Sequence, residues 1–207
     1  MNDACPAIAA IVLAAGKSSR MGANKLLLPL DGHPLVWHAV RTACASSADL
    51  VLVVLGNEAE RFAAALPPGR YRRVDNPRFA EGLSTSLQAG LDALPENVDG
   101  ALILLADMPF TSPATLEALL AAAREAPDRV AAMNQGGRPT PPVYWPRALF
   151  RELHSIRGDE GGRSLLMRSP DAVHLVATAQ PDEALDVDAP EDYQRIAGRG
   201  QSSSGND

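Results

Sequence analysis

Three cations stand close together near the N-terminus, at Lys17, Arg20 and Lys25. Lys17 and Lys25 are the two lysines of the whole chain, whose 19 basic residues are otherwise arginines. No Asp or Glu occurs from residue 4 to residue 30, so these charges have no acidic partner nearby in the sequence. Arginine can bind a phosphate group as a bidentate fork, and lysine binds it as a compact point charge. The segment therefore predicts a site for a phosphate-bearing anion.

The residues before these cations favour the same interpretation. An apolar run, Ile8–Ala14, predicts a buried strand, and its last residue Ala14 and the next two, Ala15 and Gly16, are all small. Backbone N–H groups in such a loop can approach and cradle phosphate oxygens, and open α/β sheets bind ligands at the carboxyl ends of their strands. The loop matches neither GxGxxG nor GxxxxGK[ST], so it predicts neither a dinucleotide site nor a Walker-type site. A solvated glycine turn is the simpler alternative, and the absence of acids makes it the weaker one.

Two aspartates are candidate metal ligands. Asp107 follows the apolar run Ala101–Leu105, and we expect it at the same edge of the sheet as the cationic loop. Carboxylate oxygens of this kind hold Mg²⁺ together with water and substrate phosphates. The helix after Asp107 already has a start signal, with Ser112 as N-cap, so Asp107 is not needed as a cap. Asp188 lies three residues before Glu191, which is also the spacing of a helix capping box, so cap and ligand both stay open.

Two glycine-containing segments are further candidates. In the segment 82–91, Gly82 precedes Ser84 and Ser86 at the start of a predicted helix, whose N–H groups and hydroxyls could bind a base, ribose or phosphate. For Ser84 alone, ordinary N-capping is the better interpretation. The loop Gly158–Gly162 leads into Arg163, which could anchor the phosphate of a second substrate; a tight turn between two helices is an equal alternative.

Strand-length apolar runs alternate with helical periodicity, which predicts an α/β fold with a mostly parallel sheet. The expected strands are Ile8–Ala14, Leu50–Leu55, Ala101–Leu105, Val130–Met133 and Val173–Ala177. The expected helices are Pro34–Ala45, Glu58–Leu66, Ser84–Leu94, Pro113–Glu125, Arg147–His154, Arg163–Arg168 and Pro190–Ala197. We expect a Gly/Pro-rich loop at Gly136–Pro142, one domain over residues 1–198 and a polar tail over 199–207.

Composition narrows the class of protein. The 207 residues are 46% hydrophobic and 21% charged, with a net charge of −6, which argues against a nucleic-acid-binding protein. Two cysteines do not make a disulfide framework, so we expect a reducing cytoplasm. The four histidines show no metal-ligand spacing, and we expect both tryptophans in the core. The apolar run Ala7–Ala15 lacks a basic flank and is too short to span a bilayer, so no membrane contact is expected.

The string LAAGKSSRMGANKLLLPLDGHPL, residues 13–35, resembles the signature of the nucleotidyltransferases that act on the molybdenum cofactor. The resemblance extends over most of the chain, through residues 76–91, 104–120, 136–145, 158–166 and 186–193. It is strongest to the cytidylyltransferase branch, because the guanylyltransferases usually read LAGG where this chain reads LAAG. The GDEGGR segment at 158–163 is also more typical of the cytidylyl branch.

This resemblance implies a Rossmann-like three-layer α/β/α fold and an enzyme that transfers CMP from CTP to the phosphate of molybdopterin, with release of pyrophosphate. It implies Mg²⁺ held by Asp107 and Asp188, and a molybdenum hydroxylase as a possible recipient of the product. The alternatives are a guanylyltransferase of the same family, a nucleotidyltransferase for a sugar or polyol phosphate, and a non-catalytic carrier of the cofactor.

The resemblance also assigns roles to individual residues. Lys25, Arg20 and Asp107 are the expected catalytic residues, with Lys25 at the α-phosphate and with Lys17 and Arg20 at the outer phosphates. Arg163 is the candidate for the second substrate. The expected nucleotide-binding residues are Leu13, Ala14, Ala15, Gly16, Lys17, Ser18, Arg20, Lys25, Gly82 and Ser86.

Overall fold

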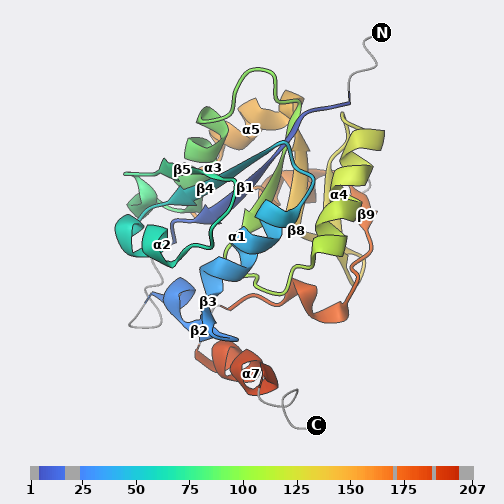
Figure 1. Cartoon of the computed structure of the whole chain (residues 1–207). Helices are drawn as coiled ribbons and strands as arrows, with labels where there is room; N and C mark the ends of the chain where they lie inside the picture. The colour runs from blue at the N-terminus through green and yellow to red at the C-terminus, as the bar shows by residue number, and fades with distance from the viewer. Residues whose placement is uncertain (1–4, 17–23, 170–171, 188–189, 201–207) are drawn as a thin grey trace.

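A seven-stranded sheet forms the centre of the molecule (Figure 1). The computed structural model describes residues 5–16, 24–169, 172–187 and 190–200. The strand order is β5-β4-β1-β6-β8-β7-β9, and β8 runs antiparallel to both of its neighbours while the other pairs are parallel. The strands are β1 (Ile8–Ala14), β4 (Leu50–Leu55), β5 (Arg72–Asp75), β6 (Gly100–Leu105), β7 (Ala131–Gln135), β8 (Arg138–Pro146) and β9 (His174–Val176). The mostly parallel α/β sheet is as the sequence predicts.

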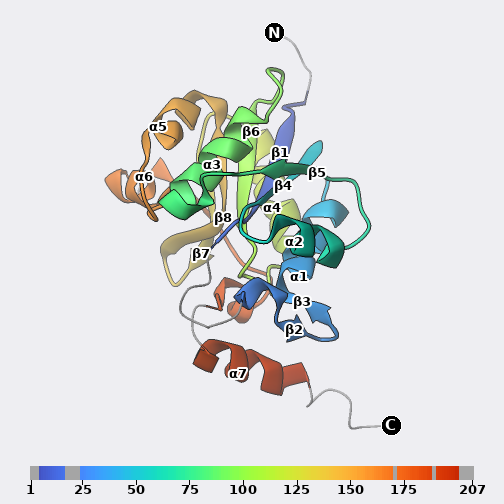
Figure 2. The ribbon, with the colours of Figure 1, turned by 90° about the vertical axis from the view of Figure 1, so that its left-hand side faces the viewer.

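Helices cover both faces of this sheet. They are α1 (Leu35–Ala45), α2 (Ala59–Ala65), α3 (Leu83–Asp92), α4 (Pro113–Glu125), α5 (Phe150–Ser155), α6 (Arg163–Arg168) and α7 (Pro190–Gly200). Figure 2 shows α3, α5 and α6 on one side of the sheet and α1 and α2 on the other. The fold is therefore the Rossmann-like three-layer α/β/α arrangement that the resemblance implies.

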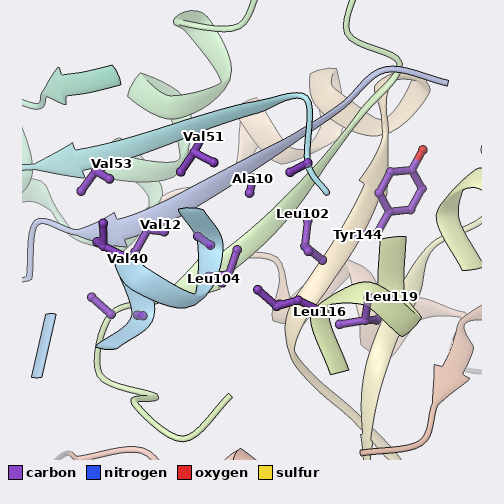
Figure 3. Close-up of a cluster of buried hydrophobic side chains, with 14 of the residues drawn as sticks. Ala10, Val12, Val40, Val51, Val53, Leu102, Leu104, Leu116, Leu119 and Tyr144 are labelled. Atoms are coloured by element: carbon purple, nitrogen blue, oxygen red, sulfur yellow. The ribbon is translucent and has the colours of Figure 1, made fainter. Parts of the chain in front are cut away.

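Alternating side chains of the strands supply two separate cores, because successive residues of a strand point to opposite faces. Val12 of β1 and Leu104 of β6 face α1 and α4, where they pack with Val40 and Leu116 (Figure 3). Ile11 belongs to the other core, together with residues of α3 and α5. Each central strand is therefore packed on both faces, because its successive apolar side chains enter the two cores in turn.

Tyr144 of β8 is fully buried at the edge of the core in Figure 3. Its hydroxyl donates a hydrogen bond to the carbonyl oxygen of Pro127 at 2.8 Å. Burial raises the pKa of Tyr144 to about 12, so the hydroxyl keeps its proton and remains a donor at neutral pH.

The loop expected at Gly136–Pro142 is wrong, because residues 138–142 belong to β8. The three prolines of this stretch made it look like a loop. Only residues 143–146 of β8 pair with β6, whereas 138–140 pair with β7 alone, so one side of the strand at Pro139 needs no ladder donor. Pro141 and Pro142 lie at a register shift between β7 and β8, where neither strand pairs with them. Gly136 and Gly137, at φ 59° and 83°, make the two-residue turn between β7 and β8. The sequence also did not reveal β5.

Most other differences are at element ends. The predicted helix Arg147–His154 is a 3₁₀ turn, Arg147–Leu149, followed by α5. Pro34 precedes α1 instead of opening it. Ser112 is the N-cap of α4 as predicted, since its hydroxyl accepts a hydrogen bond from the Thr115 N–H at 3.1 Å.

The last helix extends to Gly200, into the expected tail. It contacts the two-stranded hairpin of β2 (Pro29–Leu30) and β3 (His33–Pro34): the Tyr193 hydroxyl donates to the carbonyl oxygen of Pro29 at 2.6 Å. In the part of the chain that the structure describes, no helix has the length and apolar character needed to cross a bilayer.

Candidate active site

The loops after β1 and β6 leave the sheet side by side. Leu13 and Leu105 are register partners at the ends of these two parallel strands, and the Ala106 N–H donates to the Leu13 carbonyl oxygen at 3.1 Å. The chain crosses from β1 to β4 on one side and later returns to β6 on the other, so the strand order reverses at this point. In an open α/β sheet such a point holds the ligand crevice.

Lys25 and Asp107 meet at this reversal point, where the ligand crevice is expected. The Lys25 Nζ lies 2.8 Å from the Asp107 Oδ2, and the two side chains are only 14% and 22% exposed. Lys25 opens a 3₁₀ turn, Lys25–Leu27, in which the Leu28 N–H donates to the Lys25 carbonyl and Leu26 is buried. The sequence predicts these two residues at one edge of the sheet, and the structure brings them into direct contact.

The second carboxylate oxygen of Asp107, Oδ1, is buried and accepts no hydrogen bond from any residue that the structure describes. Leaving a buried acceptor unsatisfied costs about 1–3 kcal/mol. A divalent cation is a natural partner for such an oxygen, since Mg²⁺ takes one or two protein carboxylates plus water and phosphate. Asp107 therefore fits the metal ligand that the sequence predicts. No cluster of three or more His, Cys, Asp or Glu suited to a metal occurs among the described residues.

Four predicted site residues, Lys17, Ser18, Arg20 and Asp188, lie outside the described residues. The residue before Asp188 is placed: the Val187 N–H donates to the Asp107 carbonyl oxygen at 3.1 Å, and Val187 is fully buried. The residue next to the second predicted metal ligand is therefore bonded to the backbone of the first, Asp107.

The loop after β1 is held at both of its described ends. Ala15 is buried, and a Cβ on Gly56, after β4, would lie 2.8 Å from the Ala15 Cβ and 2.6 Å from the Phe79 Cβ. The Asn24 side-chain amide donates to Glu58 Oε2 at 3.2 Å. Hydrogen bonds from Asn24 and Arg61 lower the pKa of Glu58, so it stays ionised. These contacts fix where the loop enters and leaves.

The start of α3 differs from the prediction. Gly82, at φ 115°, precedes the helix, and Ser84 is not its N-cap. The Leu83 N–H donates to the Asp159 Oδ1 at 3.1 Å, and the Ser84 N–H donates to the Gly158 carbonyl at 2.9 Å. The hypothesis that these helix N–H groups are free for a ligand is therefore wrong, because the loop before α6 folds back and occupies them.

Ser86 lies one turn deeper in α3 and is 2% exposed. Its Oγ accepts a hydrogen bond at 3.0 Å from the Asn76 side-chain amide, which also donates to Thr85 Oγ1 at 2.9 Å. The structure thus places Ser86 in a buried polar network at the end of β5. Its contact with a nucleotide stays a prediction.

A cavity of about 780 Å³ opens beside the ends of β1 and β6. Leu13 and Leu105 belong to its lining, together with Leu87 of α3 and with Val143 and Trp145 of β8. The loop before α6 forms another part of the wall. Most of the wall is apolar, as is usual for a site that binds a small organic molecule.

Charged residues of the lining include Arg138 of β8 and Arg163 of α6, both exposed, with Glu160 and Asp186. Arg163 is a predicted site residue, whereas Arg138 was not predicted. The Gly136-Gly137 pair just before Arg138 is a hairpin signal that could have placed it at a strand start.

The two tryptophans differ. Trp145 is 3% exposed, as expected of a core residue, and it also lines the cavity. Trp37 is only half-buried: its ring stacks on His33, with centroids 3.8 Å apart, and Arg41 lies 5.0 Å from its ring centroid. The expectation of a core position is wrong for Trp37.

Comparison with known proteins agrees with this geometry. Residues 10–173 match the MobA-like NTP transferase domain. The chain belongs to this nucleotidyltransferase family. It is 37% identical over 200 residues to the purine catabolism protein PucB of Bacillus subtilis, covering 92% of this chain and 96% of PucB.

Two further similarities are also nearly full-length. The chain is 30% identical to nicotine blue oxidoreductase of Paenarthrobacter nicotinovorans, covering 92% of this chain and 97% of that protein. A solved structure described as a nucleotidyl transferase from Methanothermobacter superposes with a TM-score of 0.81 at 27% identity, covering 95% and 99% of the two chains. The protein is an enzyme of the molybdenum cofactor nucleotidyltransferase family, and its members act on nucleoside triphosphates.

Proposed function

We propose that the protein transfers a cytidylyl group from CTP to the phosphate of the molybdenum-bearing pterin cofactor, with release of pyrophosphate. One observation carries the proposal: Lys25 and Asp107 form a shielded ion pair at the crevice, and an apolar cavity with arginines on its lining opens beside it. The charged crevice suits a triphosphate, and the cavity suits a planar ring that bears a phosphate.

The unpartnered Oδ1 of Asp107 supports a divalent metal at the crevice. Asp107, with Asp188 as the second predicted carboxylate, would hold Mg²⁺, which neutralises triphosphate charge and stabilises the leaving pyrophosphate. Lys25 would turn from Asp107 to the α-phosphate, where negative charge develops during transfer. Lys17 and Arg20 would bind the outer phosphates.

The acceptor needs no general base. Its attacking atom is a phosphate oxygen, which is largely ionised near neutral pH. The described residues that line the cavity include no histidine, in agreement with a reaction that depends on positioning and charge neutralisation. The carrier hypothesis is weaker, since holding a cofactor requires neither Lys25 nor an unpartnered carboxylate oxygen.

The choice of cytosine rests on the LAAG sequence. Ala15 is buried and packs closely against Gly56, so its backbone would present its groups to the base from a fixed position. A residue larger than glycine here narrows the base end of the site and favours a pyrimidine over a purine.

The cavity favours a pterin over a sugar or polyol phosphate. A sugar presents hydroxyls on all sides and needs a polar wall, whereas Leu13, Val143 and Trp145 offer apolar surface. The two lining arginines would bind the acceptor phosphate.

Turnover with CTP, Mg²⁺ and the molybdenum cofactor tests the proposal, with pyrophosphate and the dinucleotide product as readouts. GTP and ATP in parallel reactions test the choice of base, and a sugar phosphate tests the choice of acceptor. We expect product with CTP and the pterin. Preferential use of GTP would place the protein with the guanylyltransferases, and turnover with the sugar phosphate alone would reject the pterin.

A further inference from the structure

The loop that joins α5 to α6 is attached to the first turn of α3. Asp159 accepts the Leu83 N–H through Oδ1 at 3.1 Å, and the Gly158 carbonyl accepts the Ser84 N–H at 2.9 Å. The residue at the N-cap position, Gly82, has no side chain to cap these groups. Asp159 therefore supplies to the first residue of α3, from 76 residues away in sequence, a side-chain acceptor of the kind that an N-cap residue provides to the first turn.

The fit at this attachment is close. A Cβ on Gly82 would lie 2.6 Å from the Gly158 carbonyl carbon and 2.8 Å from the Asp159 Oδ1. Gly82 is at φ 115° and Gly158 at φ 70°, both in the region that favours glycine. Two glycines thus allow the two backbones to approach, and the carboxylate of Asp159 joins them.

The same loop forms part of the cavity wall. Gly161, Gly162 and Arg163 line the cavity, and so does Leu83 of α3. A Cβ on Gly162 would lie 2.5 Å from Trp145 Cζ2, and one on Gly161 would lie 3.2 Å from Leu83 Cδ2. The position of the wall therefore depends on where Asp159 fastens the loop. Figure 2 shows α3 and α6 on the same side of the sheet.

We propose that Asp159 is a positioning residue for the acceptor substrate: its bond to the Leu83 N–H fixes the loop that carries Arg163 to the cavity. The inference rests on the proposed function, because it assumes that the cavity binds the acceptor. Asp159 contacts α3 and not the reacting atoms, so its loss should weaken acceptor binding and leave the nucleotide crevice with Lys25 and Asp107 intact.

The test compares Asp159→Ala with Asp159→Asn. Alanine removes the acceptor atom, whereas asparagine keeps an Oδ1 that can still accept from the Leu83 N–H and removes only the charge. We expect Asp159→Ala to raise the KM for the acceptor substrate by about 5–10-fold, the scale of one ordinary net hydrogen bond, because the contact between Arg163 and its ligand would be weakened and not removed. The KM for CTP should stay within about twofold, and Asp159→Asn should stay near wild type for both substrates.

Ser112→Ala is the matched control, because it removes the N-cap of α4, a helix that does not line the cavity. A general loss of stability would affect this variant and Asp159→Ala alike. Hydrogen exchange of the Leu83 and Ser84 amides gives a readout that needs no turnover: exchange should quicken in Asp159→Ala and remain slow in Asp159→Asn and in the control.

The outcomes separate the two claims. Absence of turnover in the wild type with every acceptor would reject the proposed function. Wild-type turnover with an unchanged acceptor KM in Asp159→Ala would reject the positioning role alone. An equal rise of the acceptor KM in Asp159→Asn would also reject the positioning role. It would show that the negative charge of Asp159, and not its hydrogen bond to the Leu83 N–H, affects binding of the acceptor substrate.

Discussion

The crevice and the cavity differ in how charge and apolar surface are exposed to water. At the crevice between β1 and β6, an ion pair is shielded from water, and the backbone enters it from strands with both faces buried. At the cavity beside β8, the wall is apolar and the arginines Arg138 and Arg163 are exposed. Charge in a shielded site acts strongly on a transition state, whereas exposed charge and apolar area mainly set binding. We therefore expect mutations in the crevice to lower kcat and mutations in the cavity to raise the acceptor KM.

The largest effect should come from the crevice. Lys25→Ala and Asp107→Ala should each lower kcat by at least ~100-fold, the scale of losing one preorganised electrostatic stabiliser. Steady-state assays with CTP and the acceptor measure this. Asp128→Ala, an exposed acid before β7 at the amino ends of the strands, is the matched control and should leave kcat unchanged. Near-normal turnover in either crevice variant would remove that residue from the mechanism.

The cavity should respond differently. Arg163→Ala and Arg138→Ala should each raise the acceptor KM by ~5–10-fold with little change in kcat, since each removes a cation that can bind the acceptor phosphate. The KM for CTP, measured at saturating acceptor, is the internal control. A drop in kcat with an unchanged acceptor KM in these variants would contradict the expectation that the cavity acts mainly on binding.

Substitutions of two glycines beside the crevice, Gly56 and Gly16, should differ in their effect on thermal stability. A Cβ on Gly56 would clash with Ala15 and Phe79, so Gly56→Ala should destabilise the fold by about 1–3 kcal/mol. For a chain of this size the Tm should fall by roughly 2–10 °C. Among the residues that the structure describes, no atom lies within 4 Å of a Cβ on Gly16, so Gly16→Ala should keep the wild-type Tm. Thermal melts distinguish the two, and equal melting temperatures would contradict the tight packing at Ala15.

The smallest effect on catalysis should come from the cap of α4. Ser112→Ala removes the side-chain acceptor for the Thr115 N–H and should cost about 1 kcal/mol, with the Tm falling by roughly 2–4 °C. Both KM values should stay at the wild-type level. A change in either KM would mean that α4 shapes the substrate sites, which its position outside the cavity lining does not suggest.

Apolar runs in the sequence predicted the central strands correctly. The runs Ile8–Ala14 and Leu50–Leu55 are uniformly apolar because both faces of the sheet are covered, and their bounds match β1 and β4. Lys25 and Asp107 were predicted at one edge because parallel strands bring their carboxyl ends together. Their direct contact follows from the sheet order.

The rest depended on contacts between distant segments. Pro139 of β8 is tolerated because only β7 pairs with that part of the strand, and Pro141 and Pro142 lie at a register shift where neither neighbouring strand pairs with them. Composition does not show this pairing. The N–H groups of α3 were expected to be free, but Asp159 and Gly158 reach them from another loop. No local signal marked that contact, since Asp159 reads as an exposed acid in a glycine-rich turn.

The account depends on one claim: the enzyme binds a nucleotide at the charged crevice and a pterin in the apolar cavity, and joins the two. The most direct test is a single reaction with CTP, Mg²⁺ and the molybdenum cofactor, in which pyrophosphate and the cytosine dinucleotide form of the cofactor are both quantified. We predict equal amounts of the two products in the wild type and at least ~100-fold less of both in Lys25→Ala. Pyrophosphate without the dinucleotide product, or product formation that survives the loss of Lys25, would contradict the account.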